Sequence, residues 1–264
     1  MTIIINQEQQ LKELYEYKNW LVLVSGGWES TLMALELNDY RTEEINFVLL
    51  NNDTGLRLKK SVETLEKLKE VVKPDEYIEI KASEYLKESK RVKEKKVKEV
   101  LDYSFRQIDR QIERMNKGLK YDRNYFRCCS LLKKNPFHWW IRKNREKYKP
   151  EESIIVSGIA PYESRQRAYR LVELRKKGTF KRFYKTVGYW FFYPYRDFYK
   201  RKEVYEELVK RGFKGIEHSG CIVCPIMLIF EDFKKKEPEA YARSKRYLNN
   251  LLGLKNCQEE VEGE

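Results

Sequence analysis

The stretch Trp20-Leu21-Val22-Leu23-Val24-Ser25-Gly26-Gly27-Trp28-Glu29-Ser30 decides the fold. Five consecutive apolar residues that end at a glycine pair predict a buried strand followed by a tight turn. Apolar residues at helical spacing, among them Leu32 and Leu35, then predict a helix. A strand, a glycine turn and a helix in this order are typical of a parallel sheet whose strands are joined by helices.

Further strand patterns follow at residues 45–50, 77–80, 153–158 and 189–193, and helical patterns occupy residues 7–17 and 58–72. Their alternation predicts an α/β fold, mainly a parallel sheet with helices on both faces. We expect a single nucleotide-binding domain over residues 1–254 and a polar tail over 255–264. Residues 84–120 are rich in Lys and Arg with apolar residues at near-helical spacing. This segment predicts a long basic helical insertion, which is either a solvated surface or an arm that grips a polyanion.

The composition narrows the class of protein. The 264 residues include 54 Lys and Arg against 41 Asp and Glu, a net charge of +13, which favours an anionic partner such as a nucleotide or a nucleic acid. Lys and Glu are abundant and there are only 2 His, a composition like that of hyperthermophile proteins. This bias is an alternative explanation for the high density of charged residues. There is no run of about 18 apolar residues and no basic leader, so we expect an intracellular protein outside membranes.

The Ser-Gly-Gly turn after the first strand has the properties of an anion site. Glycine lets the backbone turn sharply and approach a ligand closely, and N–H groups at a helix N-terminus favour phosphate. Serine and threonine hydroxyls add donors. An ordinary strand-to-helix turn is the alternative interpretation. The candidate binding residues here are Ser25, Gly26, Gly27, Glu29, Ser30 and Thr31.

Four of the 5 cysteines form two closely spaced pairs. Cys128 and Cys129 are adjacent, and Cys221 and Cys224 form a Cys-x-x-Cys. Two such pairs can bring four soft thiolates to one centre, which suits an iron–sulfur cluster or zinc. Zinc ligands usually have residues between them, which disfavours zinc at the adjacent pair. Disulfides or free thiols remain the alternative.

Several motifs resemble a known family. Residues 25–30 resemble the PP-loop of the adenine nucleotide alpha-hydrolase superfamily, Ser-Gly-Gly-x-Asp-Ser, with Glu29 in the place of Asp. Later motifs are similar, in the same order, to those of the phosphoadenosine phosphosulfate (PAPS) reductase family, although Ala160 replaces a common Arg. These motifs are Asp53-Thr54-Gly55, Gly158-Ile159, Glu163-Ser164-Arg165-x-Arg167 and Phe192-Tyr193-Pro194-Tyr195-Arg196-Asp197.

The resemblance implies that ATP, adenylylsulfate (APS) or PAPS binds at these motifs, with Mg²⁺ as a candidate ion. Arg165 and Arg167 suit phosphate or sulfate because a guanidinium can donate two parallel hydrogen bonds, although pairing with an acidic residue is an equal alternative. The further binding residues implied are Asp53, Gly55 and Gly158.

The four cysteines resemble the Cys-Cys...Cys-x-x-Cys of APS reductases, which implies a [4Fe–4S] cluster bound by Cys128, Cys129, Cys221 and Cys224. Lys133 matches the Lys that lies between cluster and substrate in that family, so it is a candidate catalytic residue. The reductases attack sulfur with a cysteine in a C-terminal Glu-Cys-Gly-x-His. Cys257 lacks that context and is a weak candidate nucleophile.

Three functions follow from these patterns. The first is a sulfonucleotide reductase that binds its nucleotide beside the iron–sulfur centre. The second is an ATP-dependent, pyrophosphate-releasing sulfur transfer to tRNA or DNA. The third is a catalytically silent nucleotide-binding module. The enzyme readings would also call for an electron or sulfur donor protein as a partner, and a basic chain favours nucleic acid as a further partner.

Overall fold

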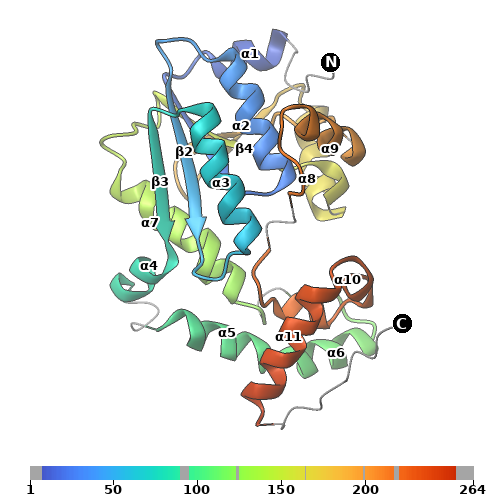
Figure 1. Ribbon diagram of the computed structural model, residues 1–264. Coiled ribbons are helices and arrows are strands. Elements are labelled where there is room, and N and C mark those ends of the chain that lie inside the picture. The colour runs from blue at the N-terminus through green and yellow to red at the C-terminus, as the bar shows by residue number, and fades with distance from the viewer. Residues whose placement is uncertain are drawn as a thin grey trace. The chain divides into compact units, whose positions relative to one another are not determined.

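The predicted strand at residues 20–24 lies at the centre of a six-stranded sheet with the order β3-β2-β1-β4-β6-β5 (Figure 1). The structure is a computed structural model that describes residues 8–89, 95–122, 125–163, 165–198, 200–216 and 220–253. The strands are β1 (Asn19–Val24), β2 (Asn46–Asp53), β3 (Glu76–Lys81), β4 (Ser153–Ser157), β5 (Lys181–Tyr184) and β6 (Tyr189–Phe192).

The sheet is mainly parallel, as the sequence predicts. Strand β1 is parallel to β2 and β4, with Val22 opposite Leu49 on one side and Val156 on the other. Strand β4 is parallel to β6. The short strand β5 is antiparallel to its neighbour β6. Strand β5 was not predicted, because its four residues, Lys-Arg-Phe-Tyr, contain no apolar run.

Helices cover both faces of the sheet, which confirms the predicted class. Alternate residues of β1 point to opposite faces: Trp20 and Val22 belong to one apolar cluster, and Leu21 belongs to another. Helices α2 (Trp28–Tyr40), α3 (Lys59–Val72) and α9 (Arg201–Lys210) contribute to the first cluster. Helix α7 (Asn135–Lys143) contributes Ile141 to the second (Figure 1).

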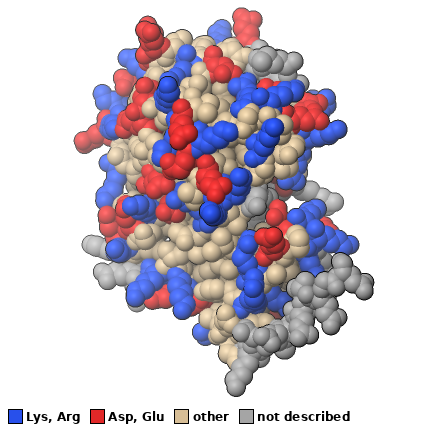
Figure 2. Space-filling view, in the orientation of Figure 1, with Lys and Arg blue, Asp and Glu red and all other residues tan. Residues whose placement is uncertain are grey.

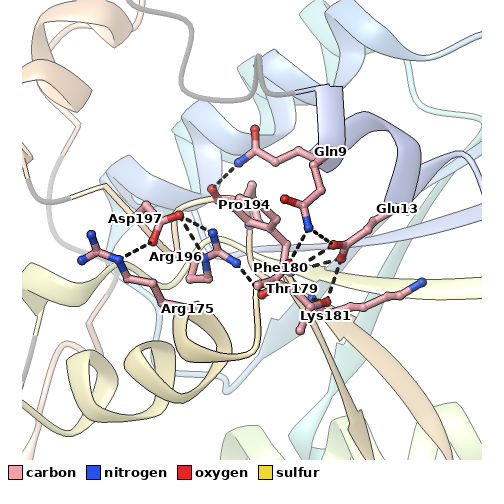
Figure 3. A network of polar contacts seen from close by, with 11 residues as sticks. Gln9, Glu13, Arg175, Thr179, Phe180, Lys181, Pro194, Arg196 and Asp197 are labelled. Atoms are coloured by element: carbon pink, nitrogen blue, oxygen red, sulfur yellow. Dashed lines mark hydrogen bonds and ion pairs between the residues drawn. The ribbon is translucent and has the colours of Figure 1, made fainter.

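Helix α1 (Glu8–Leu14) is held to the sheet edge by the polar network of Figure 3. The Glu13 carboxylate accepts hydrogen bonds from the Thr179 hydroxyl and from the Phe180 N–H, each 3.1 Å long. The buried Arg196 donates to the Thr179 carbonyl over 2.6 Å and pairs with Asp197. The motif at residues 192–197 therefore has a structural role here, since its Arg and Asp anchor the turn before β5.

The described chain divides into two compact units. The first, called the sheet unit, comprises Met1–Asp53, Leu58–Ile80 and Phe137–Ser219. The second, called the cysteine unit, comprises Thr54–Arg57, Lys81–Pro136 and Gly220–Glu264. The expectation that residues 1–254 form one domain stays a prediction, and the tail at 255–264 lies outside the described residues.

The cysteine unit is helical. The described residues of the basic segment at 84–120 are largely helical, as predicted, but they form separate short helices. A turn at Arg106 and Gln107 separates two of these helices and lets both Phe105 and Ile108 be buried. The elements of this unit are α4 (Ala82–Glu88), α5 (Val97–Phe105), α6 (Ile108–Asn116), a π-helix (Ser130–Lys134), a 3-10 helix (Pro225–Leu228), α10 (Glu231–Lys236) and α11 (Pro238–Leu251).

Helix α8 (Arg165–Lys176) and the 3-10 helix Pro161–Glu163 complete the sheet unit. On the face drawn in Figure 2, basic and acidic side chains are interleaved over much of the surface. Many form pairs three or four residues apart on one helix, such as Lys202 with Glu206. In the described parts of the chain, no helix is long and apolar enough to cross a membrane.

Candidate functional site

The turn at the end of β1 requires glycine. Gly26 has φ +73°, and a Cβ atom built on it would lie 2.3 Å from the carbonyl oxygen of Ser61. A carbonyl in the first turn of α3 cannot move aside as a flexible side chain can. Residues 25–31, the phosphate loop, are therefore packed directly against the start of α3.

The phosphate loop is ordered by its own serines. Ser30 Oγ accepts a hydrogen bond from the Ser25 N–H over 3.1 Å and donates one to the Gly27 carbonyl over 3.2 Å. Gly27 caps α2 without a side-chain hydrogen bond, which leaves the first N–H groups of α2 available to an anion. The Thr31 hydroxyl is buried with no hydrogen-bond partner. The donors that the loop leaves open to a phosphate group are therefore the first backbone N–H groups of α2.

Three parallel strands deliver predicted residues to the same edge of the sheet. Strand β1 ends before Ser25, β2 ends at Asp53, and β4 ends before Gly158. The carboxyl edge of a parallel sheet is the usual ligand site of such folds. Gly158 lies close to the loop, because a Cβ atom built on it would lie 3.0 Å from the carbonyl oxygen of Glu29.

The carboxylate of Glu29 has a partner that the sequence did not reveal. Tyr162 donates a hydrogen bond from its hydroxyl to Glu29 Oε1 over 3.1 Å. Burial and then the charge of Glu29 raise the pKa of this hydroxyl, so it stays protonated and remains a donor. The longer side chain of Glu, compared with the Asp of the family motif, is therefore fixed at its carboxylate end.

The two predicted arginines both lie at the start of α8. Arg167 forms an ion pair with Glu163, and its role in binding an anion stays a prediction. Glu163 Oε2 also accepts a 2.6 Å hydrogen bond from the Ala160 N–H, which ties the motif to the end of β4. Arg165 is the first residue of α8, but its side chain and Ser164 lie outside the described residues.

The four cysteines of the two pairs all belong to the cysteine unit. They are not joined by disulfides. Backbone contacts fix both pairs, since the Cys128 N–H donates to Ser104 Oγ over 3.3 Å and the Cys224 N–H donates to Ser244 Oγ over 2.9 Å. The Ile222 N–H donates to the Leu56 carbonyl over 2.8 Å, which holds the Cys-x-x-Cys segment against residues 54–57.

Lys133 lies among these four thiols. Burial would lower the pKa of its ammonium, but the charges of Cys221, Cys129, Cys224 and Cys128, in this order, raise the pKa above its ordinary value. Burial and the neighbouring cysteines raise the pKa of the Cys224 thiol to about 11. Lys133 lies in the π-helix that follows Cys129, and π-helical turns are frequent at functional sites.

The four free thiols form the donor set of a candidate metal centre. Four thiols that interact with one another and with one lysine match the chemistry of a soft metal site. Within the described ranges, however, no three His, Cys, Asp or Glu side chains are arranged ready to hold a metal ion. Cys257 lies outside the described residues.

Sequence reasoning missed the residues that support the predicted ones. Tyr162, Ser104 and Ser244 contact Glu29, Cys128 and Cys224 respectively. Each partner is distant in sequence from the residue that it contacts, and neither an isolated Ser nor one Tyr among 19 carries a local signal. Only the position of Tyr162, between Gly158 and Glu163, could have drawn attention to it.

The described residues thus define an α/β protein with a glycine turn at the carboxyl edge of a mainly parallel sheet. No protein-family model matches the chain, and no curated protein matches its sequence. Among solved structures, the chain is similar to the U34-tRNA thiolase NcsA from Methanococcus maripaludis with its [4Fe–4S] cluster. The identity is 12% and the TM-score 0.48, over 99% of this chain and 81% of that one. A likeness of this degree does not establish a family.

Proposed function

We propose that the chain is a PP-loop enzyme that binds ATP on the phosphate loop and activates a substrate for sulfur transfer with release of pyrophosphate. The observation that carries the proposal is the geometry of the loop: Gly26 is packed against Ser61, and the serine hydroxyls lie at an uncapped helix N-terminus. These features suit a bound phosphate group.

ATP is favoured over a sulfonucleotide by two features of the chain. The loop keeps the serines and an acidic residue of the ATP-using motif, and Tyr162 fixes the Glu29 carboxylate. A carboxylate fixed beside a phosphate site suits the binding of Mg²⁺, the usual companion of ATP.

The proposed activation step is a nucleotidyl transfer. An oxygen or nitrogen atom of the acceptor attacks the α-phosphorus of ATP, the bond from this phosphorus to the bridging oxygen breaks, and pyrophosphate leaves with the electron pair. The acceptor then carries AMP, which a sulfur nucleophile displaces in the next step. The loop N–H groups and the Ser25 hydroxyl stabilise the charge on the phosphate oxygens.

The second part of the proposal concerns the cysteine centre, defined as Cys128, Cys129, Cys221 and Cys224. Its thiolates would hold a [4Fe–4S] cluster, which supplies electron or sulfur chemistry when bound. Lys133 holds a positive charge among the thiols and lowers the cost of collecting negative charge there. A nucleic acid is the proposed acceptor, since the chain carries a net charge of +13.

The experiment that tests this function measures pyrophosphate released from ATP by anaerobically purified protein, with and without bulk tRNA or DNA. We expect release that depends on nucleic acid and falls at least about tenfold in Ser25→Ala, because one donor to the phosphate is lost. Ser83→Ala, an exposed serine of α4, is the control and should release pyrophosphate at the wild-type rate. No release by the wild-type protein under any of these conditions would contradict the proposal.

One observation supports a second function, reduction of APS or PAPS: the spacing of the four cysteines matches that of APS reductases. This function predicts sulfite release from APS or PAPS and its loss in Cys257→Ser. Sulfite release by the wild-type protein, without pyrophosphate release from ATP, would favour the reductase. Tight nucleotide binding without either reaction would favour a silent binding module.

A further inference from the structure

The phosphate loop has no cation of its own. Residues 25–31 contain no Lys or Arg, and their single charged side chain is the carboxylate of Glu29. Backbone N–H groups and hydroxyls bind one phosphate group well, but a polyphosphate chain carries several negative charges in a row. Sites for such chains use Arg or Lys in addition, because hydrogen bonds from a charged donor are about twice as strong as neutral ones.

Arg201 supplies a positive charge next to the loop. It is the first residue of α9, and its guanidinium carbon lies 4.7 Å from the ring centroid of Trp28, the residue between Gly27 and Glu29. A guanidinium stacked on an indole is stabilised by cation–π attraction, and its edge keeps its N–H donors. The Arg201 guanidinium is thus held against the side chain of Trp28, a residue of the phosphate loop.

The indole ring of Trp28, on which Arg201 stacks, is held by two contacts. The indole N–H of Trp28 donates a 2.6 Å hydrogen bond to the carbonyl of Ile216. The ring of Tyr205, one helical turn after Arg201, lies 5.0 Å from the ring of Trp28, centroid to centroid. The position of the indole, and with it that of the Arg201 guanidinium, is therefore determined by contacts within the sheet unit.

The guanidinium of Arg201 is also available to a ligand. Its side chain is exposed, and in the described part of the chain it forms no ion pair. Its basic neighbours differ, since Lys200 pairs with Glu203 and Lys202 pairs with Glu206. Arg167, the other arginine near the loop, is engaged with Glu163.

The charge of Arg201 also acts on Tyr162, the residue beside Glu29. Burial and the charge of Glu29 raise the pKa of the Tyr162 hydroxyl, whereas the positive charges of Arg201 and Arg167 act to lower this pKa. Tyr162 is the residue that donates a hydrogen bond to Glu29. The field of Arg201 therefore reaches the part of the loop where the carboxylate lies.

We propose that Arg201 binds the phosphate groups beyond the α-phosphate of the nucleotide, and that Trp28 holds it in place for this purpose. The inference rests on the proposed function, in which ATP occupies the loop. It adds a binding residue that sequence motifs did not identify and a substrate class: nucleotides that carry a polyphosphate chain, in preference to nucleoside monophosphates.

The test is isothermal titration of ATP and AMP, each with Mg²⁺, into the full-length wild-type protein, Arg201→Gln and Arg201→Lys. We expect Arg201→Gln to weaken ATP binding about 10- to 100-fold, the loss typical of a hydrogen bond to a charged group. AMP binding should change less than about twofold. Arg201→Lys should recover part of the ATP affinity, because the charge is kept but the planar stacking is lost.

Lys202→Gln is the matched control, since it removes one positive charge from the next position on the same helix. It should bind ATP as the wild-type protein does. ATP binding by Arg201→Gln at wild-type affinity would overturn the inference, as would an equal loss of ATP and AMP affinity. Failure of the wild-type protein to bind ATP would instead overturn the proposed function, so the two failures are distinguishable.

Discussion

The hydroxyl of Tyr162 lies 3.1 Å from Oε1 of Glu29 and donates a hydrogen bond to it. This contact joins the segment after β4 to the first turn of α2. It gives the acidic residue of the phosphate loop a fixed position, although its side chain is one methylene longer than that of the family motif.

Replacing Tyr162 with Phe removes this hydrogen bond and leaves the ring in place. A hydrogen bond to a charged group contributes about 1.5–3 kcal/mol, so we expect pyrophosphate release to slow by roughly tenfold or more, and a higher Mg²⁺ concentration to be needed for half-maximal rate. Steady-state rates across a Mg²⁺ titration measure both effects.

Tyr193→Phe is the control for this substitution. The Tyr193 hydroxyl donates a 2.8 Å hydrogen bond to the hydroxyl of Tyr184, so the same chemical group is lost elsewhere in the sheet unit. Its Mg²⁺ dependence should be unchanged. A Tyr162→Phe enzyme with wild-type rates at low Mg²⁺ would show that the contact does not position Glu29 for the reaction.

The contacts of α1 give a prediction about stability. Glu13→Ala leaves the buried N–H of Phe180 without its acceptor and frees the Thr179 hydroxyl. Such a loss costs about 1–3 kcal/mol, which corresponds to a fall in Tm of roughly 5 °C for a chain of this size. Differential scanning calorimetry measures this fall, and Glu8→Ala, an exposed residue of the same helix, should change Tm by less than about 1 °C. Equal Tm values for the two variants would be incompatible with the network in Figure 3.

The central part of the fold could be predicted because its signals are local. The apolar run 20–24 and the glycines after it indicate a buried strand and a turn whatever lies elsewhere in the chain, and β1 and Gly26 confirm this. The sequence of strand β5 has no such signal, because two of its four residues, Lys181 and Arg182, are cations. It forms because β6 offers an edge and because Glu13 and Arg196 hold the preceding turn.

The same distinction applies to the candidate sites. Glycine turns and paired cysteines are visible in the sequence because the spacing of their members is short. The partners Tyr162 and Arg201 are brought to the loop by packing between segments far apart in the sequence, which a single sequence does not reveal. The break between α5 and α6 was also missed, because the burial of Phe105 and Ile108 depends on tertiary packing.

If the cysteine centre holds a cluster, variants of its four cysteines should bind less iron than the wild-type protein. After anaerobic reconstitution with iron and sulfide, the wild-type protein should bind about four iron atoms per chain, as a [4Fe–4S] cluster requires. Serine in place of any one of Cys128, Cys129, Cys221 and Cys224 should lower this content and the visible absorbance. Cys257→Ser should leave both unchanged, because Cys257 is not one of the proposed ligands. Binding of zinc, or of no metal, by the wild-type protein would contradict the proposed cluster.

The steric role of Gly26 tests the central claim, that an adenine nucleotide binds on the phosphate loop. Alanine at this position meets the Ser61 carbonyl and must adopt a positive φ. Gly178 also has a positive φ, +63°, but nothing lies within 4 Å of its Cβ position, so Gly178→Ala carries the same backbone strain without the collision.

The most direct measurement is equilibrium binding of ATP to the wild-type protein, Gly26→Ala and Gly178→Ala, with circular dichroism of each variant to verify folding. Binding of ATP by the wild-type protein and Gly178→Ala, with at least about 100-fold weaker binding by folded Gly26→Ala, is the predicted result. Equal affinity of folded Gly26→Ala and wild-type protein, or no binding of ATP by either, would contradict the claim.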